Sequence, residues 1–339
     1  MDYKKILIIQ TAFLGDVILI TPLIRAVKQI FPKADIDVLV VPQYASILSN
    51  NPHIHNVIGF DKRKNKLKSF WKTGRVLRKN KYDLAIAPHS SVTTAYLMLF
   101  SGIRERLGFD RWHASKYLTM KVPHPDGVHK IQRLLQLIKP FSSKNFSIQT
   151  EIFPGEKEKN RAAELLVELK NNKDKIIALA PGSVWFTKRW PEEHYVELTK
   201  ILAERGYNLI FLGAPDEREI CQRIIDKAGV NALNLAGKTS ILESAAVIAQ
   251  SDLMICNDSG PLHIANAMKT DIFAFFGPTT RKFGYYPYRE NDMVFEIDLD
   301  CRPCGSHGSS ECPLKHFKCM REIEPLNVFK QVEKKFIGN

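Results

Sequence analysis

Short apolar runs alternate with amphipathic segments along the whole chain. An apolar run of about four to eight residues that ends at glycine, proline or a polar cluster is typical of a buried strand in a parallel sheet. In the first half, the predicted strands are residues 5–9, 36–41, 56–60, 84–87 and the short 106–108. The predicted helices, where apolar residues recur at helical spacing, are 17–30, 67–80, 93–100 and 128–138, and residues 10–16 are predicted as a loop.

The same alternation restarts in the second half after residues 139–158, which lack clear periodicity and contain Pro, Ser and Lys. The predicted strands are residues 176–180, 208–212, 233–235, 253–256 and 272–276, and the predicted helices are 159–169, 192–205, 216–228, 241–249, 261–267 and 326–336. Strands that alternate with helices predict a parallel sheet covered on both faces. We therefore expect an α/β protein of two doubly wound, Rossmann-like domains that face each other across a cleft, with ligands at the carboxyl ends of the strands. The expected bounds are 1–155, 156–325 and a C-terminal helix, 326–339, that packs on either domain.

Composition and length are those of a globular protein. The 339 residues are 45% hydrophobic and 25% charged, and no apolar run approaches the roughly 18 residues of a membrane span. The first residues, MDYKKILIIQTAFLGD, have a short apolar run without a small-residue cleavage site. This pattern predicts a first strand rather than a signal peptide, and hence a cytoplasmic protein.

The net charge of +13 points to an anionic partner. Residues 62–81 contain ten Lys or Arg and no acid, interleaved with Phe70, Trp71, Val76 and Leu77. One interpretation is a solvated helix face, and another is a surface that meets an anionic membrane or an anionic lipid substrate. Nucleic acid is a third possibility, although no familiar nucleic-acid motif accompanies the charge.

The stretch LMICNDSGPLHIANAM, residues 253–268, joins a predicted strand to a predicted helix through a polar, glycine-containing turn. Pro261 stands where a first helical turn tolerates proline. Free backbone N–H groups and the positive end of the helix dipole would make this turn an anion site. Asp258 would repel a phosphate, so it is interpreted either as a plain N-cap or as an acceptor for ligand hydroxyls and turn N–H groups.

A second polar loop, residues 10–16 (QTAFLGD), follows the first predicted strand. Gly15 permits a close approach of the backbone, and Asp16 is placed at the start of the next helix. Asp16 is either an N-cap or a general base that accepts a proton from an attacking hydroxyl.

Two further loops carry groups suited to a nucleotide. In PGSVWFTKRWP, residues 181–191, Gly182 and Ser183 offer donors and Lys188 offers a compact charge for a diphosphate. Trp185 and Trp190 could form a wall for an aromatic base or a sugar, although Trp190 with Pro191 is rather expected to pack at the start of the next helix. In GAPDE, residues 213–217, Glu217 is a candidate for ribose hydroxyls or for a helix cap. The chain has neither a P-loop lysine motif nor GxGxxG, which argues against an ATPase and a dinucleotide oxidoreductase.

Four of the six cysteines are close together in the sequence. Cys301, Cys304, Cys312 and Cys319 cluster near two histidines, with a spacing that allows either a zinc site or reduced thiols in an ordered loop. Cys221 and Cys256, in contrast, are expected to be ordinary buried thiols.

These motifs, in this order, resemble the ADP-heptose:lipopolysaccharide heptosyltransferases, glycosyltransferase family 9. The resemblance rests on LGD near the N-terminus, PGS and KRWP after mid-chain, and NDSGPLH followed by FGPT. The PGS-x-W and KRWP segment and the late CRPC, CP and HxxCM segment are closer to the type II than to the type I members of the family.

The resemblance implies a GT-B architecture, with the acceptor on the N-terminal domain and the nucleotide sugar on the C-terminal one. It implies inverting transfer of L-glycero-D-manno-heptose from ADP-heptose to the inner core of lipopolysaccharide, with Asp16 as the general base and no cofactor or catalytic metal. The donor residues carried over by motif are Ser183, Lys188, Asp258, Ser259, Gly260 and His263. Gly15, Ser90 and Ser91 fall where the family presents acceptor contacts, and the segment HSSVT departs from the Asn- or Gln-containing versions there.

The expected partners are ADP-heptose, the inner-core acceptor and the inner leaflet of the membrane, without nucleic acid. The enzyme is therefore expected to be cytoplasmic and peripheral to the inner membrane. Two alternatives remain open. One is a related transferase that uses another nucleotide sugar, and the other is a non-catalytic protein that binds nucleotides or nucleic acid.

Overall fold

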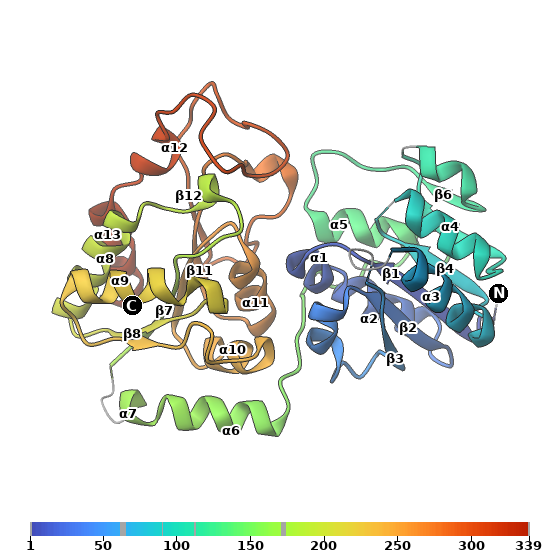
Figure 1. The fold of residues 1–339 in the computed structure, drawn as a ribbon, viewed down its shortest axis with the longest axis horizontal. Coiled ribbons are helices and arrows are strands. Elements are labelled where there is room, and N and C mark those ends of the chain that lie inside the picture. The colour runs from blue at the N-terminus through green and yellow to red at the C-terminus, as the bar shows by residue number, and fades with distance from the viewer. Residues whose placement is uncertain (1, 62–65, 90, 112, 171–173, 338–339) are drawn as a thin grey trace. The chain divides into compact units, whose positions relative to one another are not determined.

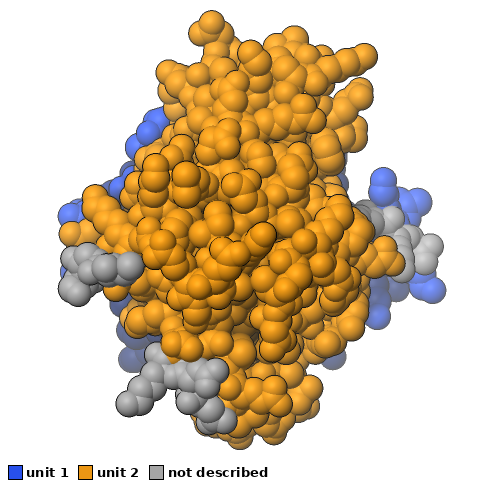
Figure 2. Space-filling model, turned by 90° about the vertical axis from the view of Figure 1, so that its left-hand side faces the viewer, with its two compact units in different colours: residues 1–153 blue, residues 154–339 orange. Residues whose placement is uncertain are grey.

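The computed structural model describes residues 2–61, 66–89, 91–111, 113–170 and 174–337. The chain forms two compact units, unit 1 from Met1 to Phe153 and unit 2 from Pro154 to Asn339 (Figure 2). The division falls within residues 139–158, the segment without periodicity. Each unit contains its own six-stranded sheet, and the two are described separately.

The sheet of unit 1 is parallel throughout and has the strand order β3-β2-β1-β4-β5-β6 (Figure 1). This is the order of a Rossmann fold, in which the chain reverses direction across the sheet between β1 and β4. The strands are β1 (Lys5–Gln10), β2 (Asp35–Val40), β3 (Asn56–Gly59), β4 (Leu84–Ala87), β5 (Glu105–Phe109) and β6 (Met120–Val122).

Helices α3 and α4 cover one face of this sheet. Their inward side chains, among them Leu77 and Leu97, join Leu7 and Ile9 of β1 in one buried apolar cluster. Side chains alternate along a strand, so Ile6 and Ile8, which are also buried, face the other side. The helices of unit 1 are α1 (Leu14–Leu19), α2 (Thr21–Ile30), α3 (Lys66–Asn80), α4 (Val92–Phe100) and α5 (Lys130–Leu135), with short helical turns η1 (Pro42–Leu48), η2 (His113–Tyr117) and η3 (Gln136–Ile138).

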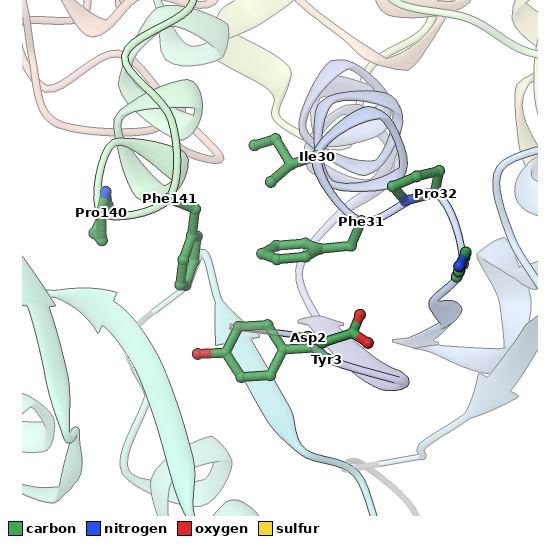
Figure 3. Close-up of a pocket in the computed structure, with 8 residues that line it drawn as sticks. Asp2, Tyr3, Ile30, Phe31, Pro32, Pro140 and Phe141 are labelled. Carbon is green, nitrogen blue, oxygen red and sulfur yellow. The ribbon is translucent and has the colours of Figure 1, made fainter.

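A cavity of about 560 Å³ lies at the amino end of β1, on the side of the sheet away from its strand-end loops (Figure 3). Tyr3, Phe31 and Phe141 meet there edge to face, with ring centroids 5.2, 5.8 and 5.4 Å apart. Such contacts add to the burial of the rings themselves. This aromatic cluster ties the end of α2 and the segment after η3 to the start of β1, so we interpret it as structural.

Unit 2 repeats the topology of unit 1. Its parallel sheet has the order β12-β11-β10-β7-β8-β9, which read from the other edge is again the Rossmann order, with the reversal between β7 and β10. The strands are β7 (Ile176–Ala180), β8 (Asn208–Phe211), β9 (Leu233–Asn234), β10 (Leu253–Asn257), β11 (Asp271–Phe275) and β12 (Met293–Phe295).

One face of the second sheet is covered by α8, α9 and the C-terminal helix α13. Tyr195, Leu198, Ile224 and Phe329 from these helices share a buried cluster with the strands, so α13 packs within unit 2. On the other side, α11 contacts β10 and β11, and α10 contacts both α11 and α6. The helices are α6 (Glu156–Leu165), α7 (Val167–Lys170), α8 (Glu192–Glu204), α9 (Arg218–Ala228), α10 (Ile241–Ile248), α11 (Gly260–Met268), α12 (Lys318–Arg321) and α13 (Pro325–Ile337), with turns η4 (Phe186–Lys188), η5 (Pro215–Glu217) and η6 (Arg281–Phe283).

The structure confirms the predicted α/β class with two parallel sheets, and it corrects several elements. The helix predicted over residues 17–30 is two helices, α1 and α2, which meet at Ile20 just before Pro22. The helices predicted over 128–138 and 159–169 are likewise α5 followed by η3, and α6 followed by α7. The edge strands β6 and β12 were not predicted, because three-residue strands are too short to show a period.

The start of α1 is a further correction. Residues 10–16 were predicted as a loop with Asp16 as a candidate N-cap, but the helix begins at Leu14 and its N-cap is Phe13. Gly15 and Asp16 therefore lie within the first helical turn. A carboxylate there is stabilised by the helix dipole without capping the helix. No helix among the described residues combines the length and the apolar character needed to cross a bilayer.

The two tryptophans of the loop after β7 allow a direct test of the core of unit 2. Trp190 is 1% exposed and stacks on Phe275 at 4.3 Å between ring centroids, whereas Trp185 is 37% exposed. We expect Trp190→Ala to lower the free energy of unfolding by about 3–5 kcal/mol. Trp185→Ala, the matched control, should change it by less than about 1 kcal/mol. Urea denaturation followed by circular dichroism measures both, and equal losses would contradict the assignment of Trp190 to the core.

Candidate functional site

Ligands of doubly wound sheets bind beyond the carboxyl ends of the strands, where the strand order reverses. In unit 2 that point lies between β7 and β10, and in unit 1 between β1 and β4. Ser183 and Lys188 follow β7, and Asp258, Ser259 and Gly260 follow β10. In unit 1, Gly15 and Asp16 follow β1, and Ser91 follows β4, so these residues also lie at a reversal point. Glu217, in contrast, follows β8.

An ion pair joins the two loops at the reversal point of unit 2. The Lys188 ammonium lies 2.6 Å from an Asp258 carboxylate oxygen, and the two side chains are 15% and 7% exposed. The same oxygen accepts a hydrogen bond from the Thr279 hydroxyl at 2.7 Å, which brings in the loop after β11. Asp258 is therefore not the N-cap of α11, and its carboxylate instead ties three strand-end loops together.

Asn257, the last residue of β10, shapes the loop that carries Lys188. Its side-chain amide donates to the carbonyl oxygens of Pro181 and Gly182 at 2.9 and 3.2 Å. Its carbonyl oxygen accepts from the Trp190 backbone N–H at 2.9 Å. The predicted packing of Trp190 against the next helix is confirmed, since its ring lies 5.2 and 5.0 Å from those of His194 and Tyr195 in α8. Its indole N–H also donates to the Ile323 carbonyl at 2.9 Å. Asn257 is buried, so these bonds are shielded from water and fix the loop.

The helix that follows β10 begins as the sequence predicts, with proline in its first turn. Ser259 is the N-cap in an extended conformation, its side chain makes no capping bond, and Gly260 is the first helical residue. Since the first N–H groups of a helix have no intrahelical partner, this end of α11 presents backbone donors and a positive dipole end. His263 lies one turn further on, buried, with its ring 6.3 Å from that of Tyr285.

Glu217 lies beside the glycines of two of these loops. Its carboxylate accepts from the Ala214 N–H at 2.8 Å and therefore acts as the cap of the turn after β8. A Cβ atom built on Gly182 would lie 2.0 Å from a Glu217 oxygen, so only glycine leaves room for this carboxylate. Burial raises the pKa of Glu217, while the Ala214 N–H and the charge of Arg189 act in the opposite direction.

Arg302 is a site-forming residue that the sequence analysis missed. Its side chain is 5% exposed, and its guanidinium donates to the carbonyl oxygens of Phe276 and Thr279 at 3.0 Å each. It also contacts the Gly277 carbonyl and pairs with Glu296 at 3.0 Å. The guanidinium thereby fixes the GPT segment, from which Thr279 reaches Asp258. Its place inside the CRPC motif is the only signal the sequence offered.

The cysteine-containing loop is attached to the same site. The Ser309 carbonyl accepts from the Thr187 backbone N–H at 3.1 Å, and the Ser309 N–H donates to the Thr187 hydroxyl at 2.8 Å. All six cysteines are free thiols, and burial raises the pKa of Cys319 to about 11. Cys221 and Cys256 are fully buried, as predicted. Among the described residues, no group of three or more Cys, His, Asp or Glu side chains is arranged to hold a metal, and zinc in this loop stays a prediction.

In unit 1, Asp16 lies beside a lysine that the sequence analysis did not single out. The Lys130 ammonium, at the start of α5, is 3.8 Å from an Asp16 carboxylate oxygen, and the side chains are 13% and 16% exposed. Burial lowers the pKa of Lys130, an effect that the Asp16 charge opposes and the nearby Arg133 and Arg111 reinforce. The Asp16 carboxylate thus lies beside a mostly buried cation.

The three predicted acceptor-binding residues differ in how they are placed. Gly15 is in the first turn of α1, next to Asp16. Ser91 is the N-cap of α4, and its hydroxyl oxygen accepts from the Thr94 N–H at 3.1 Å, so it acts as a cap. Ser90 lies outside the described residues.

Two Rossmann-like units that each carry functional loops at the reversal point define the GT-B class of glycosyltransferases. The family model that matches this chain is that of glycosyltransferase family 9 (heptosyltransferase), over residues 70–315. The chain therefore belongs to glycosyltransferase family 9 and is an enzyme of the glycosyltransferase class.

Similar proteins agree with this assignment. The chain is 27% identical to lipooligosaccharide heptosyltransferase 2 of Campylobacter jejuni, over 97% of this chain and 98% of that protein. It is 31% identical to lipopolysaccharide heptosyltransferase 3 of Escherichia coli, over 83% and 84%. The fold matches the solved structure of the E. coli ADP-heptose lps heptosyltransferase II with a TM-score of 0.81 at 24% identity, covering 98% of this chain and 99% of that one.

Breaking the Lys188–Asp258 pair should affect stability and ligand binding separately. Removing one partner of a buried pair leaves an uncompensated charge, so we expect Lys188→Met to lower the free energy of unfolding by about 3–5 kcal/mol. Lys188→Met with Asp258→Asn should recover most of this loss, yet both variants should bind ADP more weakly than the parent protein. Lys175→Met, which breaks the exposed Lys175–Asp252 pair of the same unit, should cost less than about 1 kcal/mol. Denaturation curves and calorimetry measure these effects, and undiminished ADP affinity in the double variant would contradict a binding role for Lys188.

The role of Arg302 is tested by a conservative change. Lysine cannot reproduce the planar fork of donors, so Arg302→Lys should lower the free energy of unfolding by about 1.5–3 kcal/mol. It should also speed hydrogen exchange in residues 276–280. Arg281→Lys is the matched control, because Arg281 pairs with the same Glu296 but is half exposed. Unchanged exchange in Arg302→Lys would show that the guanidinium does not hold this loop.

Proposed function

We propose that this enzyme transfers L-glycero-D-manno-heptose from ADP-heptose to the inner core of lipopolysaccharide, with inversion at the anomeric carbon. Membership of the heptosyltransferase family supports this, as do relatives named lipooligosaccharide and lipopolysaccharide heptosyltransferases. The observation that carries the proposal is the Lys188–Asp258 pair at the reversal point of unit 2, beside the free end of α11. A compact cation next to a helix N-terminus is suited to a diphosphate.

Unit 2 is proposed to hold the donor. Lys188 and the first N–H groups of α11 face the diphosphate, with Ser183 and Ser259 as further donors. Glu217 accepts hydrogen bonds from ribose hydroxyls, and His263 and Asp258 line the sugar side of the site. Because Asp258 already holds Lys188 and Thr279, its charge is partly neutralised before the ligand arrives. The leaving ADP is then stabilised by fixed charges and dipoles without a cofactor or a catalytic metal.

Unit 1 is proposed to bind the acceptor and to supply the general base. An acceptor hydroxyl oxygen attacks the anomeric carbon of heptose, the bond from that carbon to the β-phosphate oxygen breaks, and ADP leaves. Asp16 takes the proton of the attacking hydroxyl. Lys130 orients the carboxylate. Gly15 lets the acceptor approach the backbone, while Ser91 and Ser90 stay proposed acceptor contacts. This scheme makes residues 1–155 the acceptor domain and 156–325 the donor domain.

The acceptor is a phosphorylated lipid, so the proposed location is the cytoplasmic side of the inner membrane, as a peripheral protein. The exposed basic side chains of α3 support this, because anionic lipid attracts Lys and Arg. Nucleic acid is not an expected partner, and a non-catalytic binding protein is disfavoured by family membership. The alternative is a family 9 transferase that uses another nucleotide sugar. A screen of donors distinguishes it from the proposed ADP-heptose enzyme.

The direct test is incubation with ADP-heptose and a set of truncated lipopolysaccharides, with products read by mass. The proposal expects one added heptose on an inner-core acceptor and released ADP. No added heptose on any inner-core acceptor, or equal transfer from other nucleotide sugars, would contradict the proposed specificity.

Asp16→Asn isolates the base. The amide keeps the shape of the side chain but cannot accept a proton at neutral pH, so turnover should fall by about 10²–10⁴-fold. ADP should bind with unchanged affinity, because the donor site is assigned to unit 2. Asp35→Asn, at the half-buried first residue of β2, serves as the control and should keep full activity. Turnover of Asp16→Asn within a few-fold of the parent enzyme would remove Asp16 from the mechanism.

A further inference from the structure

Helices α3 and α4 of unit 1 form an apolar groove. The cavity has a volume of about 960 Å³. Its lining is mainly apolar and aromatic and includes Leu67, Phe70, Val92, Tyr96, Leu99 and Phe100. Helices α3 and α4, which supply most of this lining, lie side by side in unit 1 (Figure 1).

The side chains of this groove are unusually exposed for their size. Leu67 is 78% exposed, Val92 is 52% and Trp71, at the groove's edge, is 50%. Single exposed apolar residues are normal in proteins, but a contiguous apolar patch marks a surface that is covered in function. The buried apolar side chains of the same helices, such as Leu77 and Leu97, already form the core contact with the sheet. The exposed set is thus a second apolar face on each helix.

The groove is a fixed feature of the packing. A Cβ atom on Gly74 would lie 2.3 Å from the Phe100 ring, so glycine lets α3 approach α4 closely. The Phe100 ring in turn contacts Trp71 edge to face, at 4.7 Å between centroids, and lies 5.7 Å from Phe70. These rings hold the indole at the surface, where an amphipathic ring is suited to a boundary between water and lipid.

The rim of the groove is basic. Helix α3 has no acidic residue in its fifteen, and it exposes Lys66, Lys68, Lys72, Arg75, Arg78 and Lys79. No ion pair between described residues involves these six side chains. Long basic side chains of this kind extend their charged ends to lipid phosphates while their methylene stems cover apolar surface.

We propose that the α3–α4 groove is the surface with which unit 1 docks onto an anionic lipid bilayer, its apolar side chains entering the interface and its basic rim meeting the headgroups. Apolar area and positive charge act together in such interfacial binding. Binding of a nucleic acid would account for the basic rim of the groove but not for its exposed leucines. A second copy of this basic chain would bring like charges together. The proposal deepens the membrane location proposed above by naming the surface and the class of lipid.

Flotation with lipid vesicles tests the proposal. The full-length protein should float with vesicles of phosphatidylethanolamine and phosphatidylglycerol, should bind pure phosphatidylcholine far more weakly, and should be released by salt. Lys68→Gln with Lys72→Gln should weaken binding to anionic vesicles by about fivefold for each charge. Leu67→Gln with Leu99→Gln should weaken it while leaving the charge unchanged.

Matched double variants on unit 2 are the controls. Leu314→Gln with Leu326→Gln removes two exposed leucines, and Lys200→Gln with Lys330→Gln removes two exposed charges. Both should float like the parent protein. Equal loss in the α3–α4 variants and in the controls would contradict the proposal, as would binding that is lost only in the charge variants and is matched by nucleic acid.

Trp71 gives a second readout. Lipids brominated in the acyl chain should quench part of the tryptophan fluorescence in the parent protein, and Trp71→Phe should abolish that part. Quenching that persists in Trp71→Phe would place another surface against the bilayer. Concentration-dependent dimers that dissociate in Leu67→Gln with Leu99→Gln would assign the groove to a second copy of the chain and overturn the proposal.

Different results would contradict the docking proposal and the proposed reaction. The α3–α4 variants should transfer heptose to a delipidated inner-core oligosaccharide at the parent rate and lose activity only on acceptor embedded in vesicles. If the parent protein transfers no heptose at all, the reaction is wrong while vesicle binding still tests the groove.

Discussion

The ion pair between Lys188 and Asp258 is the interaction on which the architecture of unit 2 depends. It spans the reversal point of the sheet, where the loops after β7 and β10 diverge, and Thr279 draws the loop after β11 to the same carboxylate. A buried pair of this kind costs desolvation and is a weak source of stability in itself. Its value lies in holding a cation at a defined position beside the start of α11. Asn257 and Arg302 keep the flanking loops in register through buried hydrogen bonds.

Unit 1 has the same topology as unit 2. Each unit carries a Lys–Asp pair at its strand-end loops, Asp16 with Lys130 in unit 1 and Lys188 with Asp258 in unit 2. In the proposed reaction, the carboxylate of the first pair takes the proton of the acceptor, and the cation of the second pair binds the diphosphate. The basic, partly apolar face of α3 and α4 is a third surface. It is suited to the membrane in which the proposed lipid acceptor is embedded.

Much of this architecture could be predicted from the sequence because the signals are local. Buried parallel strands are continuous apolar runs, and the strands at the centre of each sheet lie within a residue or two of their predicted bounds. The Pro261 turn and the burial of Trp190 also followed from local chemistry. Local signals failed where tertiary contacts determine the bounds of an element. The break at Ile20, the short edge strands and the start of α1 at Leu14 leave no period to detect.

In the candidate site, too, local features could be predicted from the sequence and tertiary contacts could not. The residue types at the strand ends were apparent, but their partners were not, since Lys130 and Arg302 are distant in sequence from the groups they hold. Asp258 appeared as a candidate cap because a strand–turn–helix pattern cannot reveal that Lys188, seventy positions away, takes its carboxylate. Glu217 illustrates the reverse case, in which the simpler alternative, a cap for the turn after β8, describes the observed contact.

In the proposed reaction, the reversal point of unit 2 holds the diphosphate of the donor. Hydrogen–deuterium exchange with and without ADP tests this placement most directly. We expect protection on ADP binding in residues 181–188, 258–263 and 277–280, with AMP protecting them less. Protection confined to unit 1, or equal effects of ADP and AMP on these segments, would contradict it.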